Sequence, residues 1–216
     1  MEKSTCICIP CMDMVNTDFM MALSNLERPK HTCCATTKSS LIYDARNALA
    51  KQAINNDFDR VLWLDSDVIF EPDLLTRLSK HLDNGLEYVS GLYFMRRTPT
   101  SPVIYKKISQ VQDGRELVTK ALSYEDYPKD QLFEVDASGF GAVLMDVGLL
   151  KRVWDKYGLP FSPALGLGED ISFCWRAKQL GAKLYCDSSV KLGHIGYTVY
   201  SEETYFNQIN GTKEAK

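Results

Sequence analysis

The stretch Arg60-Val-Leu-Trp-Leu-Asp65-Ser66-Asp67-Val-Ile-Phe70 decides the fold that we expect for this chain of 216 residues. Its residues 61–64 are apolar and bulky, a pattern that predicts a strand buried on both faces. The two carboxylates that follow would lie at the carboxyl end of that strand, where open α/β sheets bind ligands. Oxygen donors placed there suit a hard divalent cation such as Mg2+ or Mn2+, and such a cation can bind a diphosphate.

A second Asp-x-Asp, Asp57-Phe58-Asp59, serves as an internal control. Seventeen aspartates in 216 residues give roughly one such triplet by chance, so the triplet alone is a weak signal. A polar segment, residues 54–56, precedes Asp57, and we expect a solvated loop there. The alternative interpretation of Asp65 and Asp67 is helix capping combined with surface charge.

Charge and apolar content narrow the classes of function. Acidic residues exceed basic residues by 28 to 25, the formal charge is −3, and no basic block occurs, so electrostatics give no support for nucleic-acid binding. The first residues do not resemble a charged-then-apolar leader, and no window reaches the ~18 apolar residues of a membrane span. We therefore expect a chain without a membrane span that works in the cytoplasm.

Seven cysteines, several of them inside apolar runs, predict reduced and buried thiols rather than a disulfide framework. The spacing Cys8-Ile9-Pro10-Cys11 leaves two other interpretations open. A redox dithiol would suit the end of a first strand, although such domains are shorter than this chain. A zinc site would also have to use the adjacent Cys33 and Cys34, which is an uncommon arrangement.

Strand and helix patterns alternate along the first half of the chain, which predicts a Rossmann-like α/β fold with a mostly parallel central sheet flanked by helices. Later, two strands at 103–107 and 116–120 flank an Asp113-Gly114 turn, which predicts a small antiparallel β elaboration. We expect one domain with a flexible C-terminal tail. The expected ranges are 1–206 for the domain, divided into halves 1–94 and 95–206, and 207–216 for the tail.

Two further groups of residues point to chemistry. Gly166-Leu-Gly168-Glu169-Asp170 combines glycines, which let backbone approach a ligand, with two acids at a helix start. Capping of that helix would explain one of the acids. Gly193-His194-Ile195-Gly196 offers a late histidine, which is the commonest metal ligand, although a lone histidine is more often a satisfied structural residue.

Together these motifs resemble those of GT-A-fold glycosyltransferases, and the likeness is closest to short family-two-like enzymes of phages and bacteria. It extends from about Ile7 to Tyr197, and its specificity lies in the order of the motifs rather than in any one of them. The motifs that carry it are Ala45-Arg46-Asn47, Leu64-Asp65-Ser66-Asp67, Gly139-Phe140-Gly141, Gly168-Glu169-Asp170 and Gly193-His194.

The resemblance implies that a sugar moves from a nucleotide-sugar donor, such as a UDP- or GDP-sugar, to a hydroxyl acceptor. The acceptor stays open: a polysaccharide, a protein and a modified nucleic acid are all compatible, and the acidic balance disfavours nucleic acid. A phage-encoded member would act in the host cytoplasm. Residues 1–94 would be the nucleotide-binding half and residues 95–206 the acceptor-side half. The residues implied in donor binding are Pro10, Arg46, Asn47, Asp65, Ser66, Asp67, Gly139 and Gly141.

The resemblance also implies catalytic and metal-binding residues. Asp65, Asp67 and His194 would hold Mn2+ or Mg2+ on the donor diphosphate. Glu169 and Asp170 match the acidic catalytic pair, in which Asp170 is the general base of inverting members. One segment departs from the family, because residues 34–37, Cys-Ala-Thr-Thr, stand where many members carry paired aspartates. The identity of the nucleotide base therefore stays open.

Several alternatives remain at this stage. The Gly-Glu-Asp motif with a late Gly-His also resembles the retaining polypeptide N-acetylgalactosaminyltransferases, although inversion is favoured. A nucleotidyltransferase usually has an early glycine-rich phosphate loop, which residues 6–19 lack. A non-catalytic protein that binds nucleotide sugars would keep the fold without turnover. The aromatic segment 197–206 is interpreted either as a lid that closes over ligand or as a packed terminus.

Overall fold

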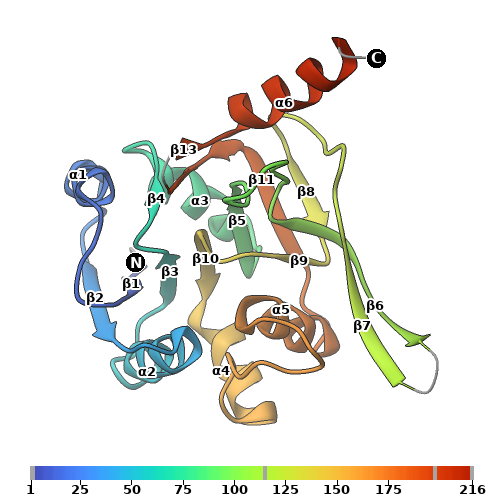
Figure 1. Ribbon diagram of the computed structural model, residues 1–216. Coiled ribbons are helices and arrows are strands. Elements are labelled where there is room, and N and C mark those ends of the chain that lie inside the picture. The colour runs from blue at the N-terminus through green and yellow to red at the C-terminus, as the bar shows by residue number, and fades with distance from the viewer. Residues whose placement is uncertain (1–2, 114–115, 197–198, 215–216) are drawn as a thin grey trace.

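A seven-stranded sheet forms the centre of the computed structural model, which describes residues 3–113, 116–196 and 199–214. In spatial order its strands are β2 (Thr32–Lys38), β1 (Thr5–Cys11), β3 (Arg60–Leu64), β10 (Ala142–Asp146), β5 (Tyr88–Leu92), β11 (Leu184–Lys191) and β8 (Leu132–Val135). Five strands run in one direction, while β10 and β8 run against them. The expected α/β class with a mostly parallel central sheet is confirmed (Figure 1).

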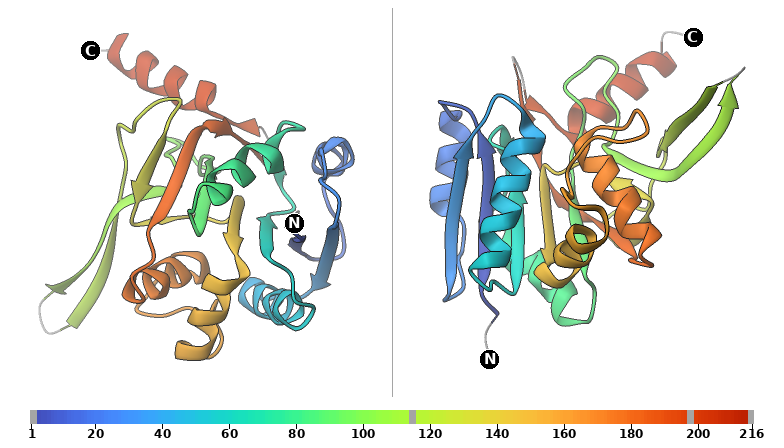
Figure 2. Two further views of the ribbon diagram at one scale, coloured as in Figure 1. Left: turned by 180° about the vertical axis from the view of Figure 1, so that it is seen from behind. Right: turned by 90° about the horizontal axis from the view of Figure 1, so that it is seen from below.

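Helices cover both faces of the sheet and give the molecule three layers (Figure 2). On one face, α1 (Thr17–Asn25) and α3 (Leu74–Asp83) contribute to an apolar core shared with Leu62 and Leu64. On the opposite face lie three helices whose apolar residues pack around Trp63. These are α2 (Ile42–Asn55), α4 (Val147–Tyr157) and α5 (Glu169–Gln179).

Strand β3 is buried on both faces, as its apolar run predicts. All five of its residues are buried, and Trp63 packs against Phe161 with ring centroids 4.9 Å apart. Leu62 and Leu64 point into the other core. Because the strand is fixed on both sides, the segment that begins at Asp65 leaves the sheet at a defined position, and the backbone N–H of Asp65 donates to the carbonyl oxygen of Gly141 at 3.2 Å.

Strand β10 is a part of the sheet that the sequence patterns did not predict. It lies between β3 and β5 and runs antiparallel to both. Residues 142–145, Ala-Val-Leu-Met, are fully buried. A short apolar run of this kind does not distinguish a buried strand from a buried helix segment. Its insertion joins the two halves 1–94 and 95–206 in one sheet.

Two smaller sheets are antiparallel. One combines β7 (Glu116–Ser123), β6 (Ile104–Asp113) and β9 (Ala137–Ser138), so the expected antiparallel elaboration is confirmed. The β6–β7 hairpin projects from the body of the molecule (Figure 1), and the Gly114 of its expected turn lies outside the described residues. The other sheet combines β13 (Val199–Tyr200), β12 (Gly193–Ile195) and β4 (Val68–Ile69).

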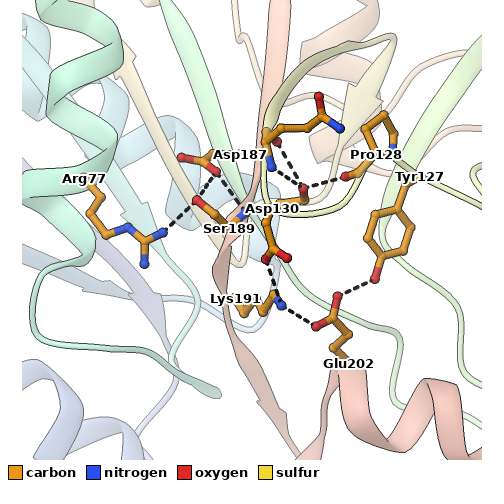
Figure 3. Close-up of polar contacts among 10 residues, drawn as sticks. Arg77, Tyr127, Pro128, Asp130, Asp187, Ser189, Lys191 and Glu202 are labelled. Carbon is orange, nitrogen blue, oxygen red and sulfur yellow. Dashed lines mark hydrogen bonds and ion pairs between the residues drawn. The ribbon is translucent and has the colours of Figure 1, made fainter.

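Most of the expected C-terminal tail, 207–216, is helical, because α6 spans Glu202–Glu214. Its flexibility stays a prediction. Contacts hold the first turn of α6: Glu202 accepts from Lys191 at 2.6 Å and from the Tyr127 hydroxyl at 2.9 Å (Figure 3). Tyr205 is buried in the core, which places this part of the segment 197–206 as a packed terminus. Within the described residues, no helix has the length and apolarity needed to cross a bilayer.

Candidate functional site

A hollow of about 270 Å³ lies at the carboxyl end of β3. Residues from six separate parts of the chain line it, and eight of the ten were expected from the sequence. The lining residues are Pro10, Ile42, Arg46, Asp65, Ser66, Asp67, Arg96, Glu169, Asp170 and His194. The control pair Asp57 and Asp59 lies elsewhere, with Asp59 bound to Lys3 and to Ser4 at the opposite end of β3.

A buried arginine forms the inner wall of the hollow. Arg46, from α2, is 2% exposed and donates from Nη2 to Asp65 at 2.6 Å and from Nε to Glu169 at 3.3 Å. Its guanidinium also lies over the ring of Phe140, 5.1 Å from the centroid. Burial raises the pKa of Asp65 against the attraction of Arg46, and the neighbouring charge of Asp67 acts in the same direction as burial. These contacts fix α2, the end of β3 and the start of α5 relative to one another.

Asp67 and His194 form the outer wall. Strand β12 pairs with β4, and the backbone N–H of Ile195 donates to the Asp67 carbonyl at 2.7 Å, which brings His194 Nε2 to 3.6 Å from Asp67 Oδ1. Burial acts to raise the pKa of Asp67, but contacts with His194 and Arg96 outweigh it and the pKa is lowered. Asp67 is therefore an ionised carboxylate at neutral pH.

The tautomer of the neutral His194 ring is set by the contact of Nδ1. His194 Nδ1 lies 2.8 Å from the carbonyl oxygen of Phe94, which can only accept, so Nδ1 carries the proton. In neutral His194 the lone pair of Nε2 then faces a carboxylate oxygen at a distance longer than a hydrogen bond. Two electron-pair donors that face one another in this way, with the histidine oriented by a carbonyl, are suited to a shared cation.

The donors present fit a hard divalent cation only in part. Within the described ranges, no group of three His, Cys, Asp or Glu side chains is already gathered around a point that could hold a metal ion. The expected metal set of Asp65, Asp67 and His194 stays a prediction. One oxygen of Asp65 is already bound by Arg46. Asp67 and His194 suit an ion such as Mg2+, which usually takes one or two carboxylates and completes its shell with water and phosphate oxygens.

Asp170 is an acid whose surroundings disfavour its charged form. It lies in the first turn of α5, where the backbone N–H of Ile171 donates to its Oδ1 at 2.7 Å. Burial, reinforced by the charge of Glu169, raises the pKa of Asp170 to about 6. No ion pair of Asp170 occurs among residues 3–113, 116–196 and 199–214, whereas Glu169 is bound to Arg46. The two neighbouring acids are therefore differentiated, Glu169 as a structural partner and Asp170 as a group able to exchange a proton.

Three residues expected to contact the donor do not line the hollow. Asn47 is buried, and its Oδ1 accepts from the backbone N–H of Phe161 at 3.0 Å, so it holds the loop before α5. Gly139 and Gly141 make room for a neighbouring side chain. A Cβ at Gly139 would lie 1.9 Å from the Tyr93 hydroxyl, and one at Gly141 would lie 3.0 Å from the Tyr93 ring. The two glycines therefore leave space for the Tyr93 side chain.

Two residues of the hollow were not expected from the sequence. Ile42, in the first turn of α2, is exposed and apolar. Arg96 lies in the loop after β5 and contacts Asp67 at 2.8 Å. The only signal for Arg96 in the sequence is the pair Arg96-Arg97 within a polar loop, and the pattern does not say which arginine turns inward.

Comparisons with known proteins support the fold. No family model matches this chain, and no curated protein matches it in sequence. The crystal structure of A197 from STIV is similar, with a TM-score of 0.63 at 20% sequence identity. The likeness covers 89% of this chain and 86% of that chain. At this identity it shows a shared fold alone, so function has to be argued from the site.

The raised pKa of Asp170 predicts a pH-dependent cost to stability. A carboxyl group with a folded pKa of about 6 and an ordinary value of 3.8 destabilises the folded state when it is ionised. Asp170→Asn should therefore raise the free energy of unfolding at pH 7.5 by about 1–3 kcal/mol. The gain should shrink as the pH falls through 6 and vanish near 3.8. Denaturant unfolding at several pH values measures this.

The matched control is Asp57→Asn, at an exposed residue whose positive φ of 53° asparagine also tolerates. It should change stability little at any pH. If the two variants had the same stability at pH 7.5, the ionised carboxylate of Asp170 would not destabilise the folded state, and the raised pKa would be contradicted.

Proposed function

We propose that this protein is a metal-dependent glycosyltransferase of the GT-A type that moves a sugar from a nucleotide-sugar donor to a hydroxyl acceptor. One observation carries the proposal: Asp67 and His194, which face one another at 3.6 Å, and an acid with a raised pKa, Asp170, line the same hollow. This is what the reaction needs, because the leaving diphosphate gains negative charge while the acceptor hydroxyl loses a proton.

Asp67 and His194 would hold the divalent cation, Mn2+ or Mg2+. When bound, the cation supplies neutralisation of the charge that collects on the leaving diphosphate. The lining residues include four carboxylates and two guanidinium groups, so these six groups give the hollow a net charge of −2 (two positive and four negative charges). A diphosphate would be repelled by that field, and a divalent cation removes the repulsion.

Asp170 would act as the general base. The acceptor oxygen forms a bond to C1 of the sugar, the bond from C1 to the diphosphate oxygen breaks with its electron pair, and the acceptor proton passes to Asp170. A pKa of about 6 leaves Asp170 mostly ionised at pH 7 and a stronger base than an ordinary aspartate. Attack from the face opposite the diphosphate gives inversion, which we propose over retention.

Two other functions keep the fold but fit the site less well. A nucleotidyltransferase would use the same metal and carboxylates, yet its usual glycine-rich phosphate loop is missing from residues 6–19. A non-catalytic binder of nucleotide sugars would have no need for an acid with a raised pKa in its site. The raised pKa of Asp170 therefore favours catalysis. The acceptor, whether polysaccharide, protein or modified nucleic acid, stays open.

The first test concerns the cation. Asp67→Asn should abolish the thermal stabilisation that Mn2+ and a nucleoside diphosphate give together, because it removes a charged ligand next to His194. Asp65→Asn should instead lower stability without ligand, by about 3–5 kcal/mol, since it leaves the buried Arg46 with one partner fewer. Asp57→Asn is the control for both. A loss of ligand stabilisation in the Asp57 variant equal to that in the Asp67 variant would contradict the assignment.

The second test concerns the base. Asp170→Asn should lower sugar transfer, or slow donor hydrolysis in the absence of acceptor, by about 100-fold or more, with donor affinity changed only a few-fold. In the unmodified protein the rate should fall about tenfold per pH unit below a pH near 6, as Asp170 becomes protonated. If the variant lost donor binding while it stayed folded, Asp170 would be a ligand of the donor instead.

A further inference from the structure

Arg96 reaches the hollow from the loop between β5 and β6. Its Nη1 lies 2.8 Å from Asp67 Oδ2 and donates to the carbonyl oxygen of Ile195 at 3.1 Å. Asp67 thus has a different partner on each oxygen, with Arg96 on Oδ2 and His194 facing Oδ1. A cation held between Asp67 and His194 would leave the contact with Arg96 in place.

The two arginines of the hollow differ in what they can touch. Arg46 is 2% exposed, and its Nη2 and Nε are already bound to Asp65 and Glu169. The side chain of Arg96 is 47% exposed, and its contacts with residues in the described part of the chain both use Nη1. A guanidinium group has five N–H donors in a planar fork, so those on Nε and Nη2 remain available for a ligand in the hollow.

The loop that carries Arg96 is fixed from behind by the C-terminal helix. The backbone N–H of Thr100, a residue 4% exposed, donates to Gln208 Oε1 of α6 at 2.8 Å. Phe94, whose carbonyl orients His194, packs against Tyr205 of the same helix with ring centroids 5.2 Å apart. Because α6 is itself held at Glu202 (Figure 3), the position of Arg96 is set in advance of ligand binding.

We propose that Arg96 binds the phosphate oxygens of the donor and stabilises the leaving diphosphate, as a cation supplied by the protein next to the metal. This role rests on the glycosyltransferase proposed above. When the bond from C1 to the diphosphate oxygen breaks, its electron pair stays on the diphosphate, and a planar N–H fork can bind two of the phosphate oxygens. The contact with Asp67 keeps the guanidinium aimed at the same place before and after the transfer.

Arg97 provides a matched control, because it has the same charge and lies next in the same loop. Its Nη2 donates to Ser101 Oγ at 3.1 Å within the loop, and it does not line the hollow. The variants to compare are Arg96→Ala, Arg96→Lys and Arg97→Ala in the full chain. Thermal melts without ligand establish that each is folded, which is expected for side chains at a partly exposed loop.

Titration calorimetry in the presence of Mn2+ tests the role without activity, using a panel of nucleoside diphosphates and the matching nucleosides. For the diphosphate that the unmodified protein binds, Arg96→Ala should weaken affinity by about 10- to 100-fold, the range for charged hydrogen bonds. Arg96→Lys should lie between, since it keeps the charge and loses the fork. Arg97→Ala should stay within about twofold, and affinity for the nucleoside should be the same in all variants.

The possible failures are distinguishable. If the unmodified protein bound no nucleoside diphosphate of the panel, the glycosyltransferase proposal would fall, and the role of Arg96 with it. If it bound one and Arg96→Ala bound it equally well, only the role of Arg96 would be overturned. Equal losses for nucleoside and diphosphate in Arg96→Ala would also overturn it, because Arg96 would then support the shape of the hollow rather than contact phosphate.

Discussion

The site depends on one buried ion-pair group, in which Arg46 is held between Asp65 and Glu169. A guanidinium that is 2% exposed cannot lose its charge, so it needs both carboxylates to remain in the interior. These carboxylates come from the end of β3 and the start of α5, and Arg46 comes from α2. The requirement to satisfy one charge therefore brings together three elements far apart in the sequence, and the hollow lies where they meet.

This constraint divides the acids of the hollow by role. Asp65 and Glu169 are bound to the buried guanidinium of Arg46, whereas Asp170 and Asp67 are not. Asp67 instead contacts Arg96 and faces His194 at the outer wall of the hollow. Asp67 is kept ionised by His194 and Arg96, and burial holds Asp170 closer to neutrality, with a pKa of about 6. The pKa values of two aspartates of the same hollow are thus shifted in opposite directions, that of Asp67 downward and that of Asp170 upward.

Much of this could be predicted from the sequence, and the exceptions have physical reasons. The buried strand before Asp65 and the helix that begins at Glu169 have strong local patterns, and most of the expected side chains line the hollow. Strand β10 was missed because a short buried run does not reveal its direction or its partners. Glycine signals are ambiguous in the same way: Gly139 and Gly141 accommodate Tyr93, although the sequence suggested a ligand. α6 is stabilised by tertiary contacts such as that between Lys191 and Glu202, which no local pattern contains.

The position of β10 explains why the fold and the site form together. Strand β10 lies between β3 and β5. Gly141, the residue before β10, accepts from the backbone N–H of Asp65 at the end of β3. The chain that leaves β5 therefore passes over the edge of the sheet where Asp65 lies. The carbonyl of Phe94 then orients His194, and Arg96 two residues later contacts Asp67. The outer wall of the hollow is therefore built by backbone groups of the sheet and its exits. A similar fold at 20% identity can keep those backbone positions while its side chains differ, which is why the chemistry must be established on these residues.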